Sequence, residues 1–199
     1  SMIMNRGSKF DYDNWHKHYL TPDWNYKRML PYFKKLETLY NDTDPQFAST
    51  VSYHGSKGPI SVSLPQNVDP IHYTFVDALL ASGYKFGDVN GLSQSMIAGI
   101  YPQSINPKTW TRSSSAHAYL YPRLNRTKLH ILARSHVTKL LINNKKVYGV
   151  EFDQNGVRYQ VKAGKEVILC AGAINTPQIL MLPGIGPGED LEKFDIPVV

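Results

Sequence analysis

The spacing of apolar residues predicts two helices in the first half of the chain. Over residues 23–39 apolar and aromatic side chains recur at helical spacing, with Pro31 inside the pattern. A proline is tolerated in the first turn of a helix and bends one elsewhere, so we expect a short helix that is bent or begins at Pro31. A second helical pattern runs from Pro70 and stops at Gly83, where the missing Cβ allows a left-handed cap. It predicts a helix over residues 70–82.

Alternation of apolar and polar residues predicts strands elsewhere. Residues 60–64 alternate within a loop-rich stretch, which is typical of a short strand. From residue 129 onward the pattern changes to β-branched and apolar residues, with turns at Lys145-Lys146 and Asn155-Gly156. The second half therefore predicts a β-meander that returns to a strand buried on both faces, with strands over 129–142, 147–152, 157–162 and 166–170.

The end of this meander predicts a strand, a tight turn and a helix N-terminus. The apolar run at 167–170 ends in Ala171-Gly172-Ala173, and Asn175-Thr176 then precedes Pro177 as the first helical residue. Such a turn presents backbone N–H groups and a positive helix end to a phosphate or to negative charge on a cofactor ring. The alternative is an ordinary packing turn of an α/β domain, because the stretch is no GxGxxG motif.

Composition sets a class and no function. The 199 residues carry a net charge of +6, but Lys and Arg are scattered and form no run of the kind that binds nucleic acid. No apolar stretch approaches the roughly 20 residues that cross a bilayer. Cys170 is the only cysteine and lies in an apolar run, so we interpret it as a buried hydrophobic residue rather than a nucleophile.

Seven histidines are candidates for a general base, but surface or packing roles are favoured for them. His16 and His18 lack the further ligands of a metal site, and we predict none. Two tripeptides that begin at Asn41 and Asn125 fit the acceptor pattern for N-glycosylation and permit secretion.

The stretch from Gly172 to Gly186 resembles the second signature of the glucose-methanol-choline (GMC) oxidoreductases almost position for position, except that Pro183 stands where the family has Ser. The opening residues 1–7 resemble the family's flavin-contacting motif. Further matches follow in family order, and the resemblance is closest to arthropod glucose-dehydrogenase-like members: Trp24, residues 31–37, His54-Gly55, Gly58-Pro59, residues 88–91, Gln94 and residues 112–114.

The resemblance implies a mixed α/β fold. Part of a Rossmann-like FAD-binding domain with the β-meander would comprise residues 1–40 and 125–199. Part of a substrate domain with an antiparallel sheet would comprise residues 41–124.

The resemblance also implies FAD as cofactor and the residues that contact it. The chain start would lie near the flavin ring, the backbone of one strand residue would contact the adenine end, and the turn before the last helix would approach FAD. These residues are Ser1, Met2, Ile3, Val137, Ala171, Gly172 and Ala173.

The family's GxGxxG would precede this chain and its catalytic histidine would follow it, so we expect an internal fragment with no catalytic residue of its own. The implied reaction is oxidation of a CH–OH group of a small-molecule alcohol or sugar, with hydride transfer to flavin and with a quinone or oxygen as electron acceptor. Two alternatives stay open: a non-redox lyase of the same family, and a degenerate, non-catalytic fragment. The resemblance and the two glycosylation tripeptides favour secretion.

Overall fold

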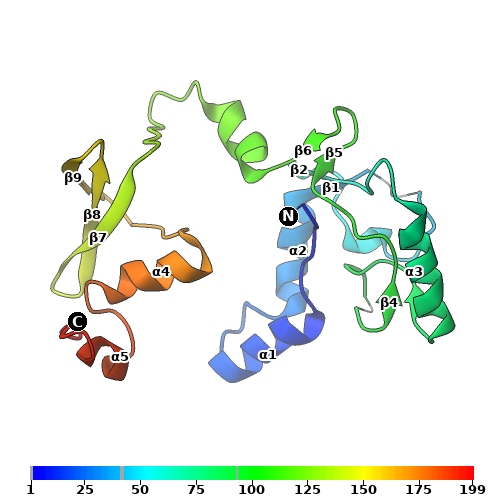
Figure 1. Cartoon of the computed structure of the whole chain (residues 1–199), viewed down its shortest axis with the longest axis horizontal. Helices are drawn as coiled ribbons and strands as arrows, with labels where there is room; N and C mark the ends of the chain where they lie inside the picture. The colour runs from blue at the N-terminus through cyan, green and yellow to red at the C-terminus, as the bar shows by residue number, and fades with distance from the viewer. Residues whose placement is uncertain (1, 41–42, 93) are drawn as a thin grey trace. The chain divides into compact units, whose positions relative to one another are not determined.

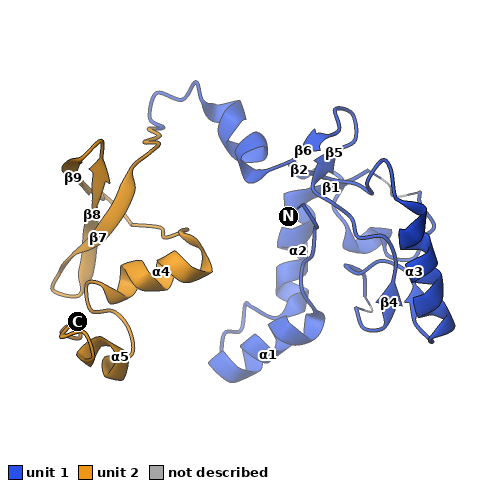
Figure 2. Cartoon of the chain, in the orientation of Figure 1, with its two compact units in different colours: residues 1–129 blue, residues 130–199 orange. Residues whose placement is uncertain are grey.

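The computed structural model describes residues 2–40, 43–92 and 94–199 (Figure 1). The chain divides into two compact units, residues 1–129 and residues 130–199 (Figure 2). The mixed α/β class expected from the sequence is confirmed. Residues 1–40 and 41–124 pack into one unit, and the division of this chain between FAD-binding and substrate domains stays a prediction.

The first helix of the N-terminal unit, α1 (Lys9–Tyr19), has no counterpart among the sequence predictions. It begins at a capping box, in which the Ser8 side chain accepts from the Asp11 N–H and the Asp11 carboxylate accepts from the Ser8 N–H. The sequence signal was present as Ser8-x-x-Asp11, but aspartate in place of the usual Glu or Gln made it easy to overlook.

The two predicted helices are present as α2 (Tyr26–Leu36) and α3 (Pro70–Ala81). Helix α2 does not begin at Pro31, because Asn25 caps it six residues earlier by accepting from the Arg28 N–H at 3.1 Å. Helix α3 follows the prediction, with Pro70 in its first turn and the left-handed Gly83, at φ +94°, just beyond its end.

Short strand pairs hold the rest of this unit together. The predicted strand at 60–64 is confirmed in part as β2 (Ile60–Val62), which pairs in parallel with β1 (Glu37–Leu39). Buried Leu39, Phe47, Ile60 and Val62 form its core. The remaining elements are β3 (Lys85–Phe86) parallel to β4 (Ile97–Ala98), β5 (Ile105–Asn106) antiparallel to β6 (Thr111–Arg112), the 3₁₀ turns η1 (Val51–Tyr53) and η3 (Tyr121–Arg123), and the π-helical turn η2 (Ala116–Leu120).

The C-terminal unit is built on the predicted meander. Strands β7 (His136–Asn143), β8 (Lys146–Gln154) and β9 (Val157–Lys162) form one antiparallel sheet. Asn155 and Gly156 both have positive φ, which is the two-residue turn that the dipeptide predicted. Asn144 and Lys145 make the other turn, one residue earlier than expected. Helices α4 (Gly172–Met181) and α5 (Gly188–Glu192) complete the unit.

The expected buried strand at 166–170 is wrong. Among the described residues this segment joins no strand ladder, Ile168 is 75 % exposed and Cys170 is exposed as well. A strand buried on both faces needs hydrogen-bonded neighbours and covering layers, and the described part of the chain provides neither. The interpretation of Cys170 as a buried residue is corrected for the same reason.

The last helix also begins earlier than predicted. Helix α4 starts at Gly172, and Pro177 lies inside it rather than at its first position. The Thr176 hydroxyl accepts from the Ala171 N–H at 3.1 Å instead of capping a helix that starts at the proline. The turn and the helix N-terminus are thus merged, and Gly172 takes the left-handed conformation, φ +89°, that a glycine adopts without strain.

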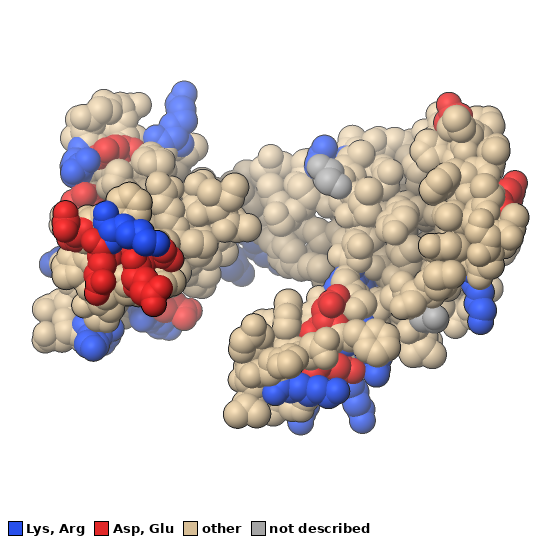
Figure 3. Space-filling model, turned by 60° about the horizontal axis from the view of Figure 1, so that its bottom comes forward, with Lys and Arg blue, Asp and Glu red and all other residues tan. Residues whose placement is uncertain are grey.

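On the face in Figure 3, groups of Lys and Arg side chains lie near Asp and Glu side chains and form no continuous basic area. No helix in the described ranges is both long enough and apolar enough to pass through a membrane.

Candidate functional site

Motif residues that are far apart in the sequence meet in the interior of the N-terminal unit. Arg6, Glu37, His54 and Asp88 form what we call the buried ion network, and each of the four side chains is at most 1 % exposed. They come from the chain start, the end of α2, the loop after η1 and the loop after β3. Charged side chains are almost never this buried unless they are paired.

Hydrogen bonds link the four side chains in series. Arg6 Nη2 pairs with Glu37 Oε1, which also lies 2.7 Å from His54 Nδ1, while His54 Nε2 lies 2.8 Å from Asp88 Oδ2. The carboxylates at the two ring nitrogens of His54 favour donation by both nitrogens and thus an imidazolium, while Arg6 Nη2, itself a donor, also lies 3.3 Å from His54 Nδ1. Two cations then balance two anions, which is the arrangement that a dry interior tolerates.

The pKa values of the coupled groups agree with this arrangement. Burial by itself lowers the pKa of His54, but its hydrogen bonds with Asp88 and Glu37 outweigh burial, and the pKa lies above its ordinary value. Burial raises the pKa of Asp88, but the hydrogen bonds from His54 and from the Asn90 N–H outweigh it and hold that pKa below its ordinary value. Both shifts favour the charged forms of the two groups.

Two glycines explain why the loop that carries His54 lies so close to Glu37. A Cβ at Gly55 or at Gly58 would come within 3.0 Å of the backbone at the end of α2 and the start of β1, closer than real Cβ atoms approach. The Gly58 N–H donates to the Glu37 carbonyl at 2.9 Å, and the Leu39 N–H donates to the Gly55 carbonyl at 2.9 Å. The His54-Gly55 and Gly58-Pro59 motifs thus form one close backbone contact.

The same interior holds the chain start, residues 2–7, which we call the clamped segment. The Asn90 side chain donates to the Met4 carbonyl at 2.8 Å and accepts from the Arg6 N–H at 3.0 Å. The Met4 N–H donates to the Pro102 carbonyl at 2.8 Å, and the Gln94 side chain donates to the Gly7 carbonyl at 2.7 Å. The segment is fixed along most of its length.

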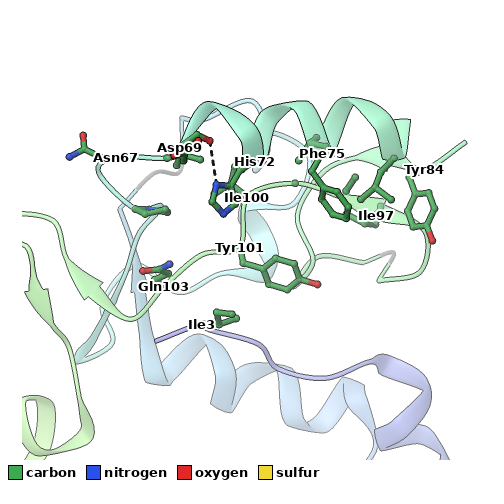
Figure 4. Close-up of a pocket in the computed structure, with 16 residues that line it drawn as sticks. Ile3, Asn67, Asp69, His72, Phe75, Tyr84, Ile97, Ile100, Tyr101 and Gln103 are labelled. Atoms are coloured by element: carbon green, nitrogen blue, oxygen red, sulfur yellow. Dashed lines mark hydrogen bonds between the residues drawn. The ribbon is translucent and has the colours of Figure 1, made fainter. Parts of the chain in front are cut away.

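The clamped segment borders a cavity of about 590 Å³. Figure 4 shows His72 and Phe75 on α3 at one side of this cavity, with Tyr101 and Ile3 opposite. The lining is mainly apolar and aromatic, with a few polar groups such as Gln103, as is common for sites that take small molecules.

A second cavity, of about 710 Å³, lies in the C-terminal unit between β7 and α4. Val137 and Ala171 both line it, so two residues predicted to contact the cofactor lie at one place. The register of the β7–β8 pair shifts between Val137 and Lys139, a bulge of the kind that re-aims the backbone near functional sites.

The structure places the remaining predicted cofactor residues as follows. Met2 is half-buried and Ile3 is 54 % exposed in the N-terminal unit, while Gly172 and Ala173 are exposed in the first turn of α4. Ser1 lies outside the described residues. The predicted set is thus divided between the two units, and its contact with FAD stays a prediction.

Sequence reasoning placed His54 and Asn90 within family motifs, but it assigned no role to Asn90 and weighed His54 as a candidate base only together with the six other histidines. His54 differs because it is buried between two carboxylates, whereas His16, His72 and His117 make local hydrogen bonds at or near the surface. The available signal was the glycine one residue after His54, since a glycine beside a polar residue indicates close backbone approach. Within the described ranges, no group of three His, Cys, Asp or Glu side chains is arranged to hold a metal ion.

These sites can be compared with known proteins. The family model for GMC oxidoreductases matches residues 1–198. The chain therefore belongs to the GMC oxidoreductase family, whose cofactor is FAD.

The similar proteins include bacterial choline dehydrogenases and flavin oxidases. The oxygen-dependent choline dehydrogenase of Staphylococcus saprophyticus is 41 % identical over 98 % of this chain, which covers 33 % of that protein. The corresponding protein of Burkholderia thailandensis is 38 % identical, with the same coverage of both chains. These relatives are choline dehydrogenases rather than the glucose-dehydrogenase-like members expected from the sequence.

Solved structures give the same family. An FAD-dependent oxidoreductase from Chaetomium thermophilum has 32 % identity and a TM-score of 0.85 over 99 % of this chain and 35 % of its own. Pyridoxine 4-oxidase from Mesorbium loti has 27 % identity and a TM-score of 0.84 over 100 % of this chain and 37 % of its own. The chain thus spans about one third of the length of the relatives it matches.

Proposed function

We propose that this chain is part of an FAD-dependent oxidoreductase that oxidises a CH–OH group of a small alcohol. The family match over residues 1–198 is the observation that carries this proposal. When bound, FAD supplies the acceptor for the hydride that leaves the alcohol carbon. The chain's own contribution is to bind and orient the cofactor and to enclose part of the substrate.

The cavity between β7 and α4 fits the adenine end of the cofactor. The backbone of Val137 and the turn at Ala171 and Gly172 would hold it there. A Cβ at Gly172 would meet nothing within 4 Å, so the space in front of this glycine is open to a ligand. The first backbone N–H groups of α4 follow directly, and no side chain caps this helix.

Met2 and Ile3 would lie beside the flavin ring. Ile3 also lines the 590 Å³ cavity, which makes this cavity the place where we expect the chain to contact the substrate. Its mainly apolar and aromatic lining suits a small organic alcohol better than a highly hydrated sugar.

The relatives' names suggest a choline-like alcohol as substrate and oxygen as acceptor. A sugar and a quinone are the alternatives that the sequence resemblance brings. The compartment follows only from the resemblance and the glycosylation tripeptides, which favour secretion.

The test uses the full-length protein. We expect it to be purified yellow, with flavin absorption, and to be bleached under anaerobic conditions by choline or another small alcohol. Glucose tested in parallel distinguishes an alcohol enzyme from a sugar enzyme. A correctly folded protein that carries no flavin would contradict the proposal.

The two alternatives give different results in the same experiment. A non-redox lyase of the family would be yellow, but no alcohol would reduce its flavin. A degenerate, non-catalytic protein would neither hold FAD nor turn over any alcohol.

A further inference from the structure

We infer that the buried ion network positions the clamped segment beside the flavin. His54 and Asp88 hold residues 2–7 from the interior of the N-terminal unit. This inference rests on the proposed function, because it takes Met2 and Ile3 as neighbours of the flavin. It adds His54, Asp88 and their partners to the residues on which cofactor binding depends, although none of them belongs to the predicted contact set.

The network is a poor device for stability alone. Removing four charged groups from water has a large free-energy cost, and replacing buried ion pairs by apolar side chains is often neutral or stabilising. In the described part of the chain, Arg6 Nε and Glu37 Oε2 are buried without a hydrogen-bond partner, so the network is not even fully satisfied. Its value therefore lies in the geometry that it fixes.

Two arms of the network grip the same short segment. One arm is ionic and runs from Asp88 through His54 and Glu37 to the guanidinium of Arg6. The other runs from the Asp88 carboxylate, which accepts from the Asn90 N–H at 2.9 Å, to the Asn90 side chain. Asp88 thus orients two groups. One is His54, which acts on Arg6 through Glu37, and the other is the Asn90 amide, which binds the Met4 carbonyl and the Arg6 N–H.

The hydrogen bonds that hold the clamped segment also determine the position of Ile3. Its even-numbered residues turn inward, with Arg6 buried and Met4 packed against the core, while Ile3 and Asn5 are exposed. An extended chain alternates its side chains between two faces, so anchoring residues 4 and 6 sets the direction of Ile3. The exposed side of the segment is then held rigid before any cofactor binds, which lowers the entropy cost of binding.

The test replaces His54 by Gln in the full-length protein, with His117→Gln as the matched control. Gln keeps a hydrogen-bonding side chain but cannot carry the charge that both carboxylates require. His117 is exposed, and its side chain contacts Ser114 Oγ at 2.9 Å and the ring of Tyr121, neither of which belongs to the network, so the same chemical change leaves the network intact. The measurements are the dissociation constant of FAD, the visible flavin spectrum and the flavin midpoint potential, with circular dichroism as a check on folding.

We expect His54→Gln to fold, to bind FAD at least tenfold more weakly, and to show an altered flavin spectrum and midpoint potential. His117→Gln should match the wild type in all three. If His54→Gln does not fold, Asp88→Asn replaces it, because Asn keeps an acceptor for the Asn90 N–H and the shape of the site; the same three changes are expected.

A folded variant with the wild-type affinity, spectrum and potential would overturn the inference and leave the network as a folding element. A wild-type protein that binds no FAD would overturn the proposed function and the inference together. The two failures are distinguishable, because only the second appears in the unsubstituted protein.

Discussion

Gly58→Ala should strongly destabilise the N-terminal unit. A Cβ at this position would lie within 3.0 Å of the backbone of Leu36 and Glu37, where no side chain rotation can relieve the contact. The loop must therefore move away from β1. The hydrogen bond from the Gly58 N–H to the Glu37 carbonyl and the one from Thr38 Oγ1 to the Gly58 carbonyl are then weakened or lost.

The size of the effect follows from these contacts. Overpacking costs about 1–3 kcal/mol, and two hydrogen bonds contribute about 1 kcal/mol each. We expect a loss of about 3–5 kcal/mol, a large part of the roughly 5–15 kcal/mol that stabilises a typical domain. With a urea dependence of about 2 kcal/mol per M, the midpoint of unfolding falls by about 2 M.

Urea unfolding followed by tryptophan fluorescence measures this change, because all three tryptophans of this sequence, Trp15, Trp24 and Trp110, belong to the N-terminal unit. Gly164→Ala is the matched control. A Cβ there meets nothing within 4 Å and its backbone is not left-handed, so the midpoint should not change. Equal midpoints for Gly58→Ala and the wild type would refute the close contact on which the network geometry depends.

Three further changes test other parts of the structure. The folded-state pKa of His54 is raised above its ordinary value of 6.5, so its contribution to stability is complete below that pH and is lost as the pH rises through the raised value. The urea midpoint of the wild type should therefore fall with rising pH. The same dependence of the midpoint on pH in His54→Gln would contradict this. Asn90→Ala leaves the Met4 carbonyl and the Arg6 N–H without their partner and should cost about 2–4 kcal/mol, with faster hydrogen exchange at the Arg6 amide; unchanged protection would exclude the clamp. Ser8→Ala removes the capping box of α1 and should cost about 1 kcal/mol, measured by thermal unfolding, whereas Ser8→Asp should retain most of the stability.

Local sequence determined the elements whose physics is local. The Asn155-Gly156 turn followed from two residues that tolerate positive φ, and the end of α3 followed from the apolar spacing and Gly83. The start of α2 did not follow, because the sequence left open whether the helix is bent at Pro31 or begins there, and the cap at Asn25 starts it earlier. The capping residue Asn25 and the proline are both local signals, and the hydrogen bond from the Arg28 N–H to the Asn25 side chain fixes the start of the helix.

Burial was harder to predict than secondary structure. Residues 167–170 are apolar and were expected in a buried strand, but the described part of the chain has no neighbour that pairs with them. Apolar residues indicate that burying a segment would stabilise the protein, and the tertiary structure shows whether other residues bury it.

The family can be read from the amino-acid sequence alone, because signatures such as residues 172–186 are continuous strings. The sequence also supplied each member of the buried ion network as part of a separate motif. The proximity of these motifs is visible only in the folded chain, because the contacts among Arg6, Glu37, His54 and Asp88 join segments up to 82 residues apart in the sequence. Electrostatic coupling depends on distance in space, so the charge of His54 and its grip on the chain start exist only in the folded protein.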